Sequence, residues 1–232
     1  MSNIHPLDVI LDAWNLTLSE GVQGSSTICV ATLDKKLNQL SYSNIGDCGL
    51  MVVRHIDSET AGYMRDRSLP RHLRKTDLKI AYISQQQLRS FNLPYQLGYS
   101  KFAEAETTQA FETPTDADTA SIPVMPGDLI VLATDGLFDN LDLEEIVEEI
   151  YKWEQEFFSA PSVAEDLRLP SKKKGNYAVQ QLAERLVKKA RELSLDNQRD
   201  SPFAILAKEN DIMWGGGMPD DTTVIVGRVV AV

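Results

Sequence analysis

Residues 126–140 read PGDLIVLATDGLFDN, and this stretch constrains the fold more than any other part of the chain. The apolar run within 128–134 is typical of a strand that is buried on both faces. The run ends directly in Asp135-Gly136, so a carboxylate stands at the end of a rigid strand beside a residue that allows close approach. Asp-Gly after a strand is also a common turn signal, and taken alone Asp135 is more often a turn residue than a ligand.

The sequence that follows predicts two helices and a last strand. Asp142 and Glu145 form the D-x-x-E signal that starts a helix, and an apolar face follows it. Residues 177–193 keep apolar side chains at helical spacing along their whole length, which predicts a long amphipathic helix. The chain then passes through a glycine-rich turn at 215–217 into a strand that reads TTVIVGRVV.

The N-terminal part predicts one helix and several strands. Apolar residues at spacings of three and four indicate an amphipathic helix over 5–20, which Gly21 ends. Three strand-like runs at 26–33, 38–45 and 49–54 then predict an antiparallel meander. Because strands come in a run before the helices and a final strand, we expect a single α+β domain over residues 1–232.

Two stretches are predicted to be surface insertions, 57–76 and 158–175. The first gathers basic side chains around Pro70, and the second contains two prolines and a basic run. The basic residues of the first are Arg65, Arg67, Arg71, Arg74 and Lys75. A solvated loop is the simplest interpretation of the 65–75 segment, and a docking surface for an acidic or phosphorylated partner is the alternative, because guanidinium groups pair well with phosphate.

Composition excludes several classes of function. The chain has 23 Lys and Arg against 34 Asp and Glu, and the resulting net charge of −11 argues against nucleic-acid binding. No apolar run approaches the roughly 20 residues that a membrane span needs. Cys29 and Cys48 have no metal-ligand spacing and are predicted to be reduced packing residues. His5, His55 and His72 match no catalytic motif.

Aspartates recur at the edges of apolar strands, always beside Gly or another Asp. They are Asp47 in NIGDCG, Asp135 in LATDGLFDN, and Asp220 with Asp221 in MPDDTTVIV. Carboxylates held on strand ends are the oxygen ligands that a hard divalent ion such as Mg²⁺ or Mn²⁺ prefers. Each aspartate alone is a weak signal, and the joint pattern predicts a divalent-metal site.

Several segments, taken in order, resemble the type 2C (PPM) protein phosphatases, and most of all the organellar branch that includes mitochondrial phosphatases. The segments are GSSTICVATLD, LSYSNIGDCGLMVVR, FNLPYQLG, PGDLIVLATDGLFDN, SPFA and GGGMPDDTTVIV. The resemblance implies an α+β fold with two packed antiparallel sheets flanked by helices and with metal ions at one end of the cleft between the sheets. It also implies a mitochondrial or other organellar location, although no targeting segment is visible. Without the resemblance, we would expect a cytoplasmic protein.

The resemblance assigns roles to the aspartates. Asp135 and Asp220 would bind one ion of a two-metal Mg²⁺ or Mn²⁺ centre, and Asp47 would help to hold a weaker third ion. Asp139 and Asp221 would support the ligands without binding an ion, and Asp221 stands where many relatives have Asn. The implied reaction is hydrolysis of phosphoserine and phosphothreonine in proteins by a metal-bound water, without a nucleophilic side chain.

The chain departs from the family pattern at its N-terminal end. In the family, a D-G-x-G-G motif, a phosphate-binding Arg and a further acidic ligand lie ahead of the helix that corresponds to 5–20, which resembles the family's second helix. This sequence contains none of them. We therefore expect a domain that lacks N-terminal strands. The alternatives are an incomplete piece of an active phosphatase, which the retained Asp135 and Asp220 favour, a pseudophosphatase that binds without hydrolysing, and an unrelated divalent-cation-binding α+β domain.

Overall fold

The computed structural model describes residues 4–57, 76–100, 111–159 and 172–230. Most of the two predicted insertions, including the Arg-rich 65–75 segment and His72, therefore lies outside the described residues. Within the described residues no helix is both long and apolar enough to cross a membrane.

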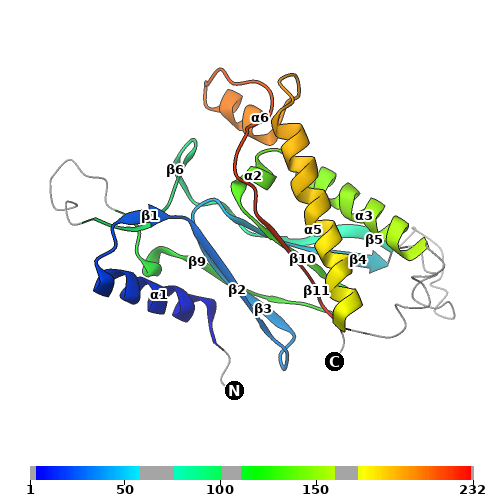
Figure 1. Cartoon of the computed structure of the whole chain (residues 1–232), viewed down its shortest axis with the longest axis horizontal. Coiled ribbons are helices and arrows are strands. Elements are labelled where there is room, and N and C mark those ends of the chain that lie inside the picture. Colours follow the sequence, from blue (N-terminus) through cyan, green and yellow to red (C-terminus); the bar gives the residue numbers. More distant parts are fainter. Residues whose placement is uncertain (1–3, 58–75, 101–110, 160–171, 231–232) are drawn as a thin grey trace.

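Two antiparallel sheets form the centre of the molecule (Figure 1). The larger has the strand order β11-β10-β4-β5, formed by Val224–Arg228, Leu129–Ala133, Gly49–Asp57 and Thr76–Ile83. The smaller has the order β2-β3-β9, formed by Ile28–Asp34, Gln39–Ile45 and Asp118–Pro123. Two short ribbons pair β1 (Gly24–Ser26) with β8 (Leu97–Tyr99) and β6 (Leu88–Ser90) with β7 (Leu93–Pro94). The predicted α+β class is confirmed.

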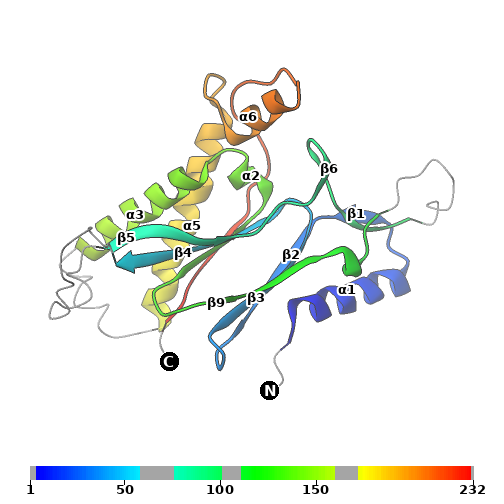
Figure 2. The same cartoon turned by 180° about the vertical axis from the view of Figure 1, so that it is seen from behind.

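Helices cover the outside of the larger sheet and flank the smaller one, as Figures 1 and 2 show. They are α1 (Pro6–Glu20), α2 (Asp135–Phe138), α3 (Leu143–Ser159), α5 (Lys172–Ser194) and α6 (Pro202–Glu209), with a short 3-10 turn at Pro114–Asp116. The predicted start of α3 is confirmed, because Asp142 and Glu145 each accept a hydrogen bond from the other's backbone amide. Gly21 ends α1 in the left-handed conformation with a φ of 65°.

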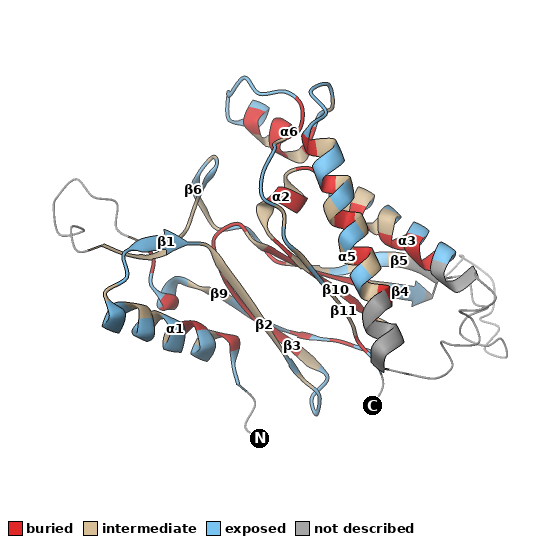
Figure 3. Cartoon of the chain, viewed as in Figure 1, coloured by how far each residue is buried: buried red, intermediate tan, exposed pale blue. Residues whose placement is uncertain are grey.

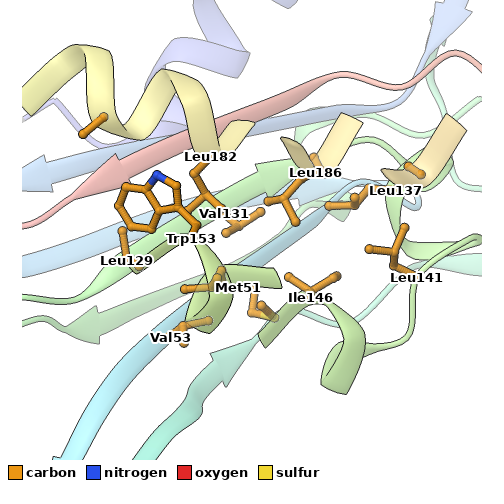
Figure 4. Packing of buried hydrophobic residues seen from close by; sticks show 14 residues of the cluster. Met51, Val53, Leu129, Val131, Leu137, Leu141, Ile146, Trp153, Leu182 and Leu186 are labelled. Carbon is orange, nitrogen blue, oxygen red and sulfur yellow. The ribbon is translucent and has the colours of Figure 1, made fainter. Parts of the chain in front are cut away.

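Strands β4 and β10 are buried on both faces. Met51, Val53, Leu129 and Val131 pack with Trp153, Ile146, Leu182 and Leu186 of α3 and α5 (Figure 4). Their alternate neighbours Leu50, Val52, Ile130 and Leu132 face the smaller sheet, where Leu40, Tyr42 and Ile122 complete the core. A strand with helices on one side and a sheet on the other has no polar face, which explains the unbroken apolar run in 128–134.

The expected three-strand meander is wrong. Strand β3 pairs with β2 and β9, whereas β4 pairs with β10 and β5 in the other sheet. The chain changes sheets at residues 46–48, where Gly46 has a φ of 107° that favours glycine. A meander would leave one apolar face of β4 in water, and passing to the second sheet buries both faces. The sequence analysis also missed β5 and β9.

Among the described residues, each sheet of the sandwich ends in edge strands. Strand β2 ends the smaller sheet and β11 ends the larger one. Ile225 of β11 is 59% exposed although it lies in a strand. Helix α1 is mostly exposed as well, with only Pro6 and Ile10 buried (Figure 3). Both cysteines are free, as expected.

Candidate metal centre

The aspartates singled out in the sequence come to one end of the larger sheet. Gly49 of β4 pairs with Ala133 of β10, which in turn pairs with Val224 of β11. Asp47 precedes Gly49, Asp135 follows Ala133, and Asp220 precedes Val224, so the register of three neighbouring strands places all of them at the same edge. Asp47 also lies in the 46–48 turn, through which the chain passes from the smaller sheet to the larger one.

Burial and mutual repulsion act on these carboxylates together. Burial raises the pKa of Asp47 to about 6, and the negative charges of Asp135 and Asp220 add to the effect. Burial likewise raises the pKa of Asp139 to about 7, with contributions from Asp135, Asp47 and Asp220. The pKa of Asp135 is also raised, by burial and then by Asp220, against a lowering by the amide of Gly136. These aspartates therefore form one electrostatically coupled group.

The group has oxygen donors of the kind that divalent cations prefer. Asp47 and Asp135 are near enough for each to shift the pKa of the other. The coupling acts through space, and among the described residues no three His, Cys, Asp or Glu side chains gather closely enough to hold an ion. Electrostatic coupling reaches further than a coordination bond, so the two observations agree. A cation would offset the repulsion, and Asp135, Asp220 and Asp47 have the oxygen donors that Mg²⁺ and Mn²⁺ prefer.

Backbone amides orient two of the candidate ligands. The amide of Gly136 donates to Asp135 Oδ1 at 2.8 Å, and the amide of Asp221 donates to Asp220 Oδ1 at 2.6 Å. Gly136 also allows the two segments to approach, because a Cβ at this position would lie 2.7 Å from both the carbonyl oxygen of Asp221 and Thr222 Oγ1. The glycine after Asp135 is thus required by the packing of the 220–222 segment against the start of α2.

Comparisons with known proteins show similarity to protein phosphatases. A human protein named Protein phosphatase PTC7 homolog is 33% identical over 207 residues, which cover 89% of this chain and 54% of that protein. A Drosophila ananassae protein named Protein phosphatase PTC7 homolog fig is 32% identical over 209 residues, covering 90% and 51%. The solved structure of the photosystem II phosphatase PBCP superposes with a TM-score of 0.64 at 26% identity, over 98% of this chain and 72% of that one. The chain is similar to these protein phosphatases over most of its own length.

The type 2C resemblance inferred from the ordered motifs is thus confirmed. A scan against protein-family models found no match. The chain spans about half the length of the two curated relatives described above.

Sequence reasoning missed Asn140, the last residue of the type 2C segment PGDLIVLATDGLFDN. Asn140 is buried and donates to the carbonyls of Gly136 at 3.0 Å and Met218 at 2.8 Å, and its Oδ1 accepts from the amide of Met218 at 2.8 Å. Its amide therefore joins the segment that carries Asp135 to the segment that carries Asp220. Only a group that both donates and accepts can make this set of bonds, whereas the sequence analysis considered carboxylates alone.

Asp139 and Asp221 occupy different surroundings. Asp139 ends α2, and its carbonyl oxygen accepts a hydrogen bond from the amide of Phe203 at 3.1 Å. Asp221 is exposed, and its carbonyl oxygen accepts from Thr134 Oγ1 at 3.2 Å. Asp139 therefore links the coupled carboxylates to α6, and Asp221 ties the 220–222 segment to the end of β10. Two of the histidines have structural contacts, since His5 caps α1 and His55 contacts Glu154 at 2.7 Å.

Proposed function

We propose that this chain is part of the catalytic domain of a phosphoserine and phosphothreonine protein phosphatase, in which Asp135 and Asp220 bind a divalent cation and Asp47 helps to hold an outer one. The observation that carries the proposal is the register of β4, β10 and β11, which places Asp47, Asp135 and Asp220 at one end of the larger sheet. Similarity to named protein phosphatases supports the reaction class. The single type 2C domain over 1–232 is part of the same proposal.

The residues of this chain would act by orienting the carboxylates that bind the cation. The amides of Gly136 and Asp221 fix one oxygen each of Asp135 and Asp220, which leaves the other oxygen of each carboxylate for a cation. Asp139 adds negative charge at the same end. Its backbone carbonyl accepts a hydrogen bond from Phe203 and so connects the site to α6. A bound Mg²⁺ or Mn²⁺ would neutralise phosphoryl oxygens and supply an activated water.

A pseudophosphatase is the second candidate. It is favoured by the absence, among the residues that the structure describes, of a group of three side chains suited to hold an ion. Such a protein would bind a partner or a phosphorylated ligand without hydrolysing it.

One experiment separates the two candidates. Mn²⁺ binding is measured by titration calorimetry, and hydrolysis of a phosphothreonine peptide is measured for this chain and for a chimera preceded by the N-terminal part of the human PTC7 homologue. We expect Mn²⁺ binding that Asp135→Asn weakens at least about tenfold, no turnover by the 232-residue chain, and turnover by the chimera that Asp135→Asn abolishes. A chimera that binds Mn²⁺ and the peptide without hydrolysis would favour the pseudophosphatase.

We further propose a phosphoprotein substrate and a mitochondrial or other organellar location, both supported by the family resemblance. Microscopy of the tagged gene product tests the location. The 65–75 segment remains a candidate docking surface for an acidic or phosphorylated partner, and charge reversal of Arg71 and Arg74 would reduce capture of a phosphopeptide if the candidate is correct.

A further inference from the structure

Two sequence signatures with no role in metal binding meet in the structure. Phe91 belongs to the FN signature at the tip of the β6–β7 hairpin, and Phe203 belongs to the SPFA signature in α6. Their ring centroids lie 5.1 Å apart with planes tilted by 52°. The ring of Trp214 lies 5.4 Å from Phe203 in an edge-on arrangement at 78°. These three side chains form an aromatic bridge between the hairpin and α6.

The hairpin end of the aromatic bridge is anchored to the Asp47 turn. The amide of Gln87, the residue before β6, donates to the carbonyl of Gly46 at 2.9 Å. The amide of Gly46 donates back to Gln87 Oε1 at 3.2 Å, and Gln86 Nε2 donates to the carbonyl of Asp47 at 3.2 Å. The base of the hairpin that carries Phe91 is therefore hydrogen-bonded to the turn that carries Asp47.

The other end of the aromatic bridge is anchored to the Asp139 and Asp220 side. The amide of Phe203 donates to the carbonyl of Asp139 at 3.1 Å. Ser201, which is fully buried, caps α6 and donates from its hydroxyl to the carbonyl of Gly216 at 2.7 Å. Trp214 lies in the same loop, which continues to Asp220. Figures 1 and 2 show the β6 hairpin, α2 and α6 at one end of the molecule.

The carboxylates themselves do not hold the two sides together. Asp47, Asp135 and Asp220 carry like charges, and their repulsion opposes a close approach. Contacts outside the carboxylates must therefore fix the spacing between the Asp47 turn and the segments that carry Asp139 and Asp220. The aromatic bridge connects those two sides through packed rings.

We infer that the aromatic bridge positions the metal centre, with Phe91 and Trp214 as positioning residues that hold the Asp47 turn against the Asp139 and Asp220 side. The inference rests on the proposed function, because it assumes that these aspartates bind a divalent cation. Loss of one aromatic contact should weaken Mn²⁺ affinity by about 3- to 10-fold, the factor that corresponds to a single ring pair.

The test measures Mn²⁺ affinity by titration calorimetry at a temperature where circular dichroism shows every variant folded. Phe91→Ala is compared with Leu93→Ala, which truncates a 40% exposed side chain in the same hairpin outside the aromatic bridge. We expect about 3- to 10-fold weaker binding for Phe91→Ala, less than about twofold change for Leu93→Ala, and near wild-type binding for Phe91→Tyr, which keeps the ring. Trp214→Leu, at a more exposed position, provides a second truncation if Phe91→Ala does not fold.

The outcomes distinguish the inference from the proposed function. Equal Mn²⁺ affinity in wild type, Phe91→Ala and Trp214→Leu would overturn the inference alone. Equal weakening by Phe91→Ala and Leu93→Ala would also overturn it, because the effect would then belong to the hairpin in general. A wild-type chain that binds no Mn²⁺ would overturn both.

Discussion

The backbone of Gly136 passes so close to Asp221 that a Cβ on the glycine would lie 2.7 Å from the Asp221 carbonyl oxygen. Gly136→Ala should therefore push the 220–222 segment away from α2 and lower the free energy of unfolding by about 1–3 kcal/mol. Urea unfolding measures this change. Gly227→Ala is the matched control, because nothing lies within 4 Å of a Cβ there, and it should be neutral or slightly stabilising. Equal effects of the two substitutions would contradict the prediction.

Removal of the cation should change stability through Asp135 and Asp220. At a Mn²⁺ concentration 100 times its dissociation constant, the wild-type chain should gain about 2.7 kcal/mol of stability, and a chelator should remove this gain. Asp135→Asn and Asp220→Asn should lose most of the gain. Without metal, Asp135→Asn should not destabilise the chain through charge, since it relieves repulsion from Asp220. Thermal unfolding with and without Mn²⁺ measures these effects, with the exposed Asp12→Asn as control.

Asn140→Ala should be among the more destabilising single substitutions near the site. It removes hydrogen bonds that connect Gly136 and Met218 in a buried position, and it leaves their backbone groups unpaired. We expect a loss of about 2–3 kcal/mol in the free energy of unfolding. Asn210→Ala, which loses one exposed bond to the carbonyl of Leu206, should cost less than about 1 kcal/mol. A loss at position 140 no larger than that at 210 would argue against the bridging role.

The Glu145–Arg199 pair predicts a pH dependence. Arg199 donates to both carboxylate oxygens of Glu145, at 3.0 and 2.7 Å, and this hydrogen bonding lowers the pKa of Glu145. A lowered pKa gives stability that is present above the unfolded pKa of about 4.3 and is lost as the pH falls through the folded pKa.

Glu145→Gln should therefore cost about 1 kcal/mol at pH 7, and the difference from wild type should shrink below about pH 4. Urea unfolding across this pH range measures the difference. Glu148→Gln, whose side chain is 63% exposed, should stay within about 0.5 kcal/mol of wild type throughout. A cost at position 145 that does not depend on pH would show that packing rather than charge is responsible.

Features that depend on local sequence could be predicted. Asp142 and Glu145 start α3 through hydrogen bonds between residues three apart. The apolar run after Asp128 forms β10, and its hydrophobicity can be read from the sequence of that segment alone. Asp135 and Asp220 were recognised as candidate ligands because each stands beside its own strand.

Features that depend on contacts between distant segments could not be predicted. The change of sheets at Gly46 is decided by what covers β4, and strand β9 has an exposed, polar sequence that gives no strand signal. The bonds of Asn140 to Met218 and the tilted ring contact of Phe91 with Phe203 join residues far apart in the chain, and neither produces a periodic pattern.

The two free thiols offer a way to observe motion at the carboxylate end of the molecule. Burial raises the pKa of Cys29 to about 12 and also raises the pKa of Cys48, which follows Asp47 directly. Alkylating reagents attack the thiolate, so both cysteines should be slow to react while the chain stays closed. Cys48 would become reactive when the turn opens, and Cys29 when β2 separates from the sandwich. The relative labelling rates of the two residues would therefore distinguish a local opening at Asp47 from unfolding of the sheets.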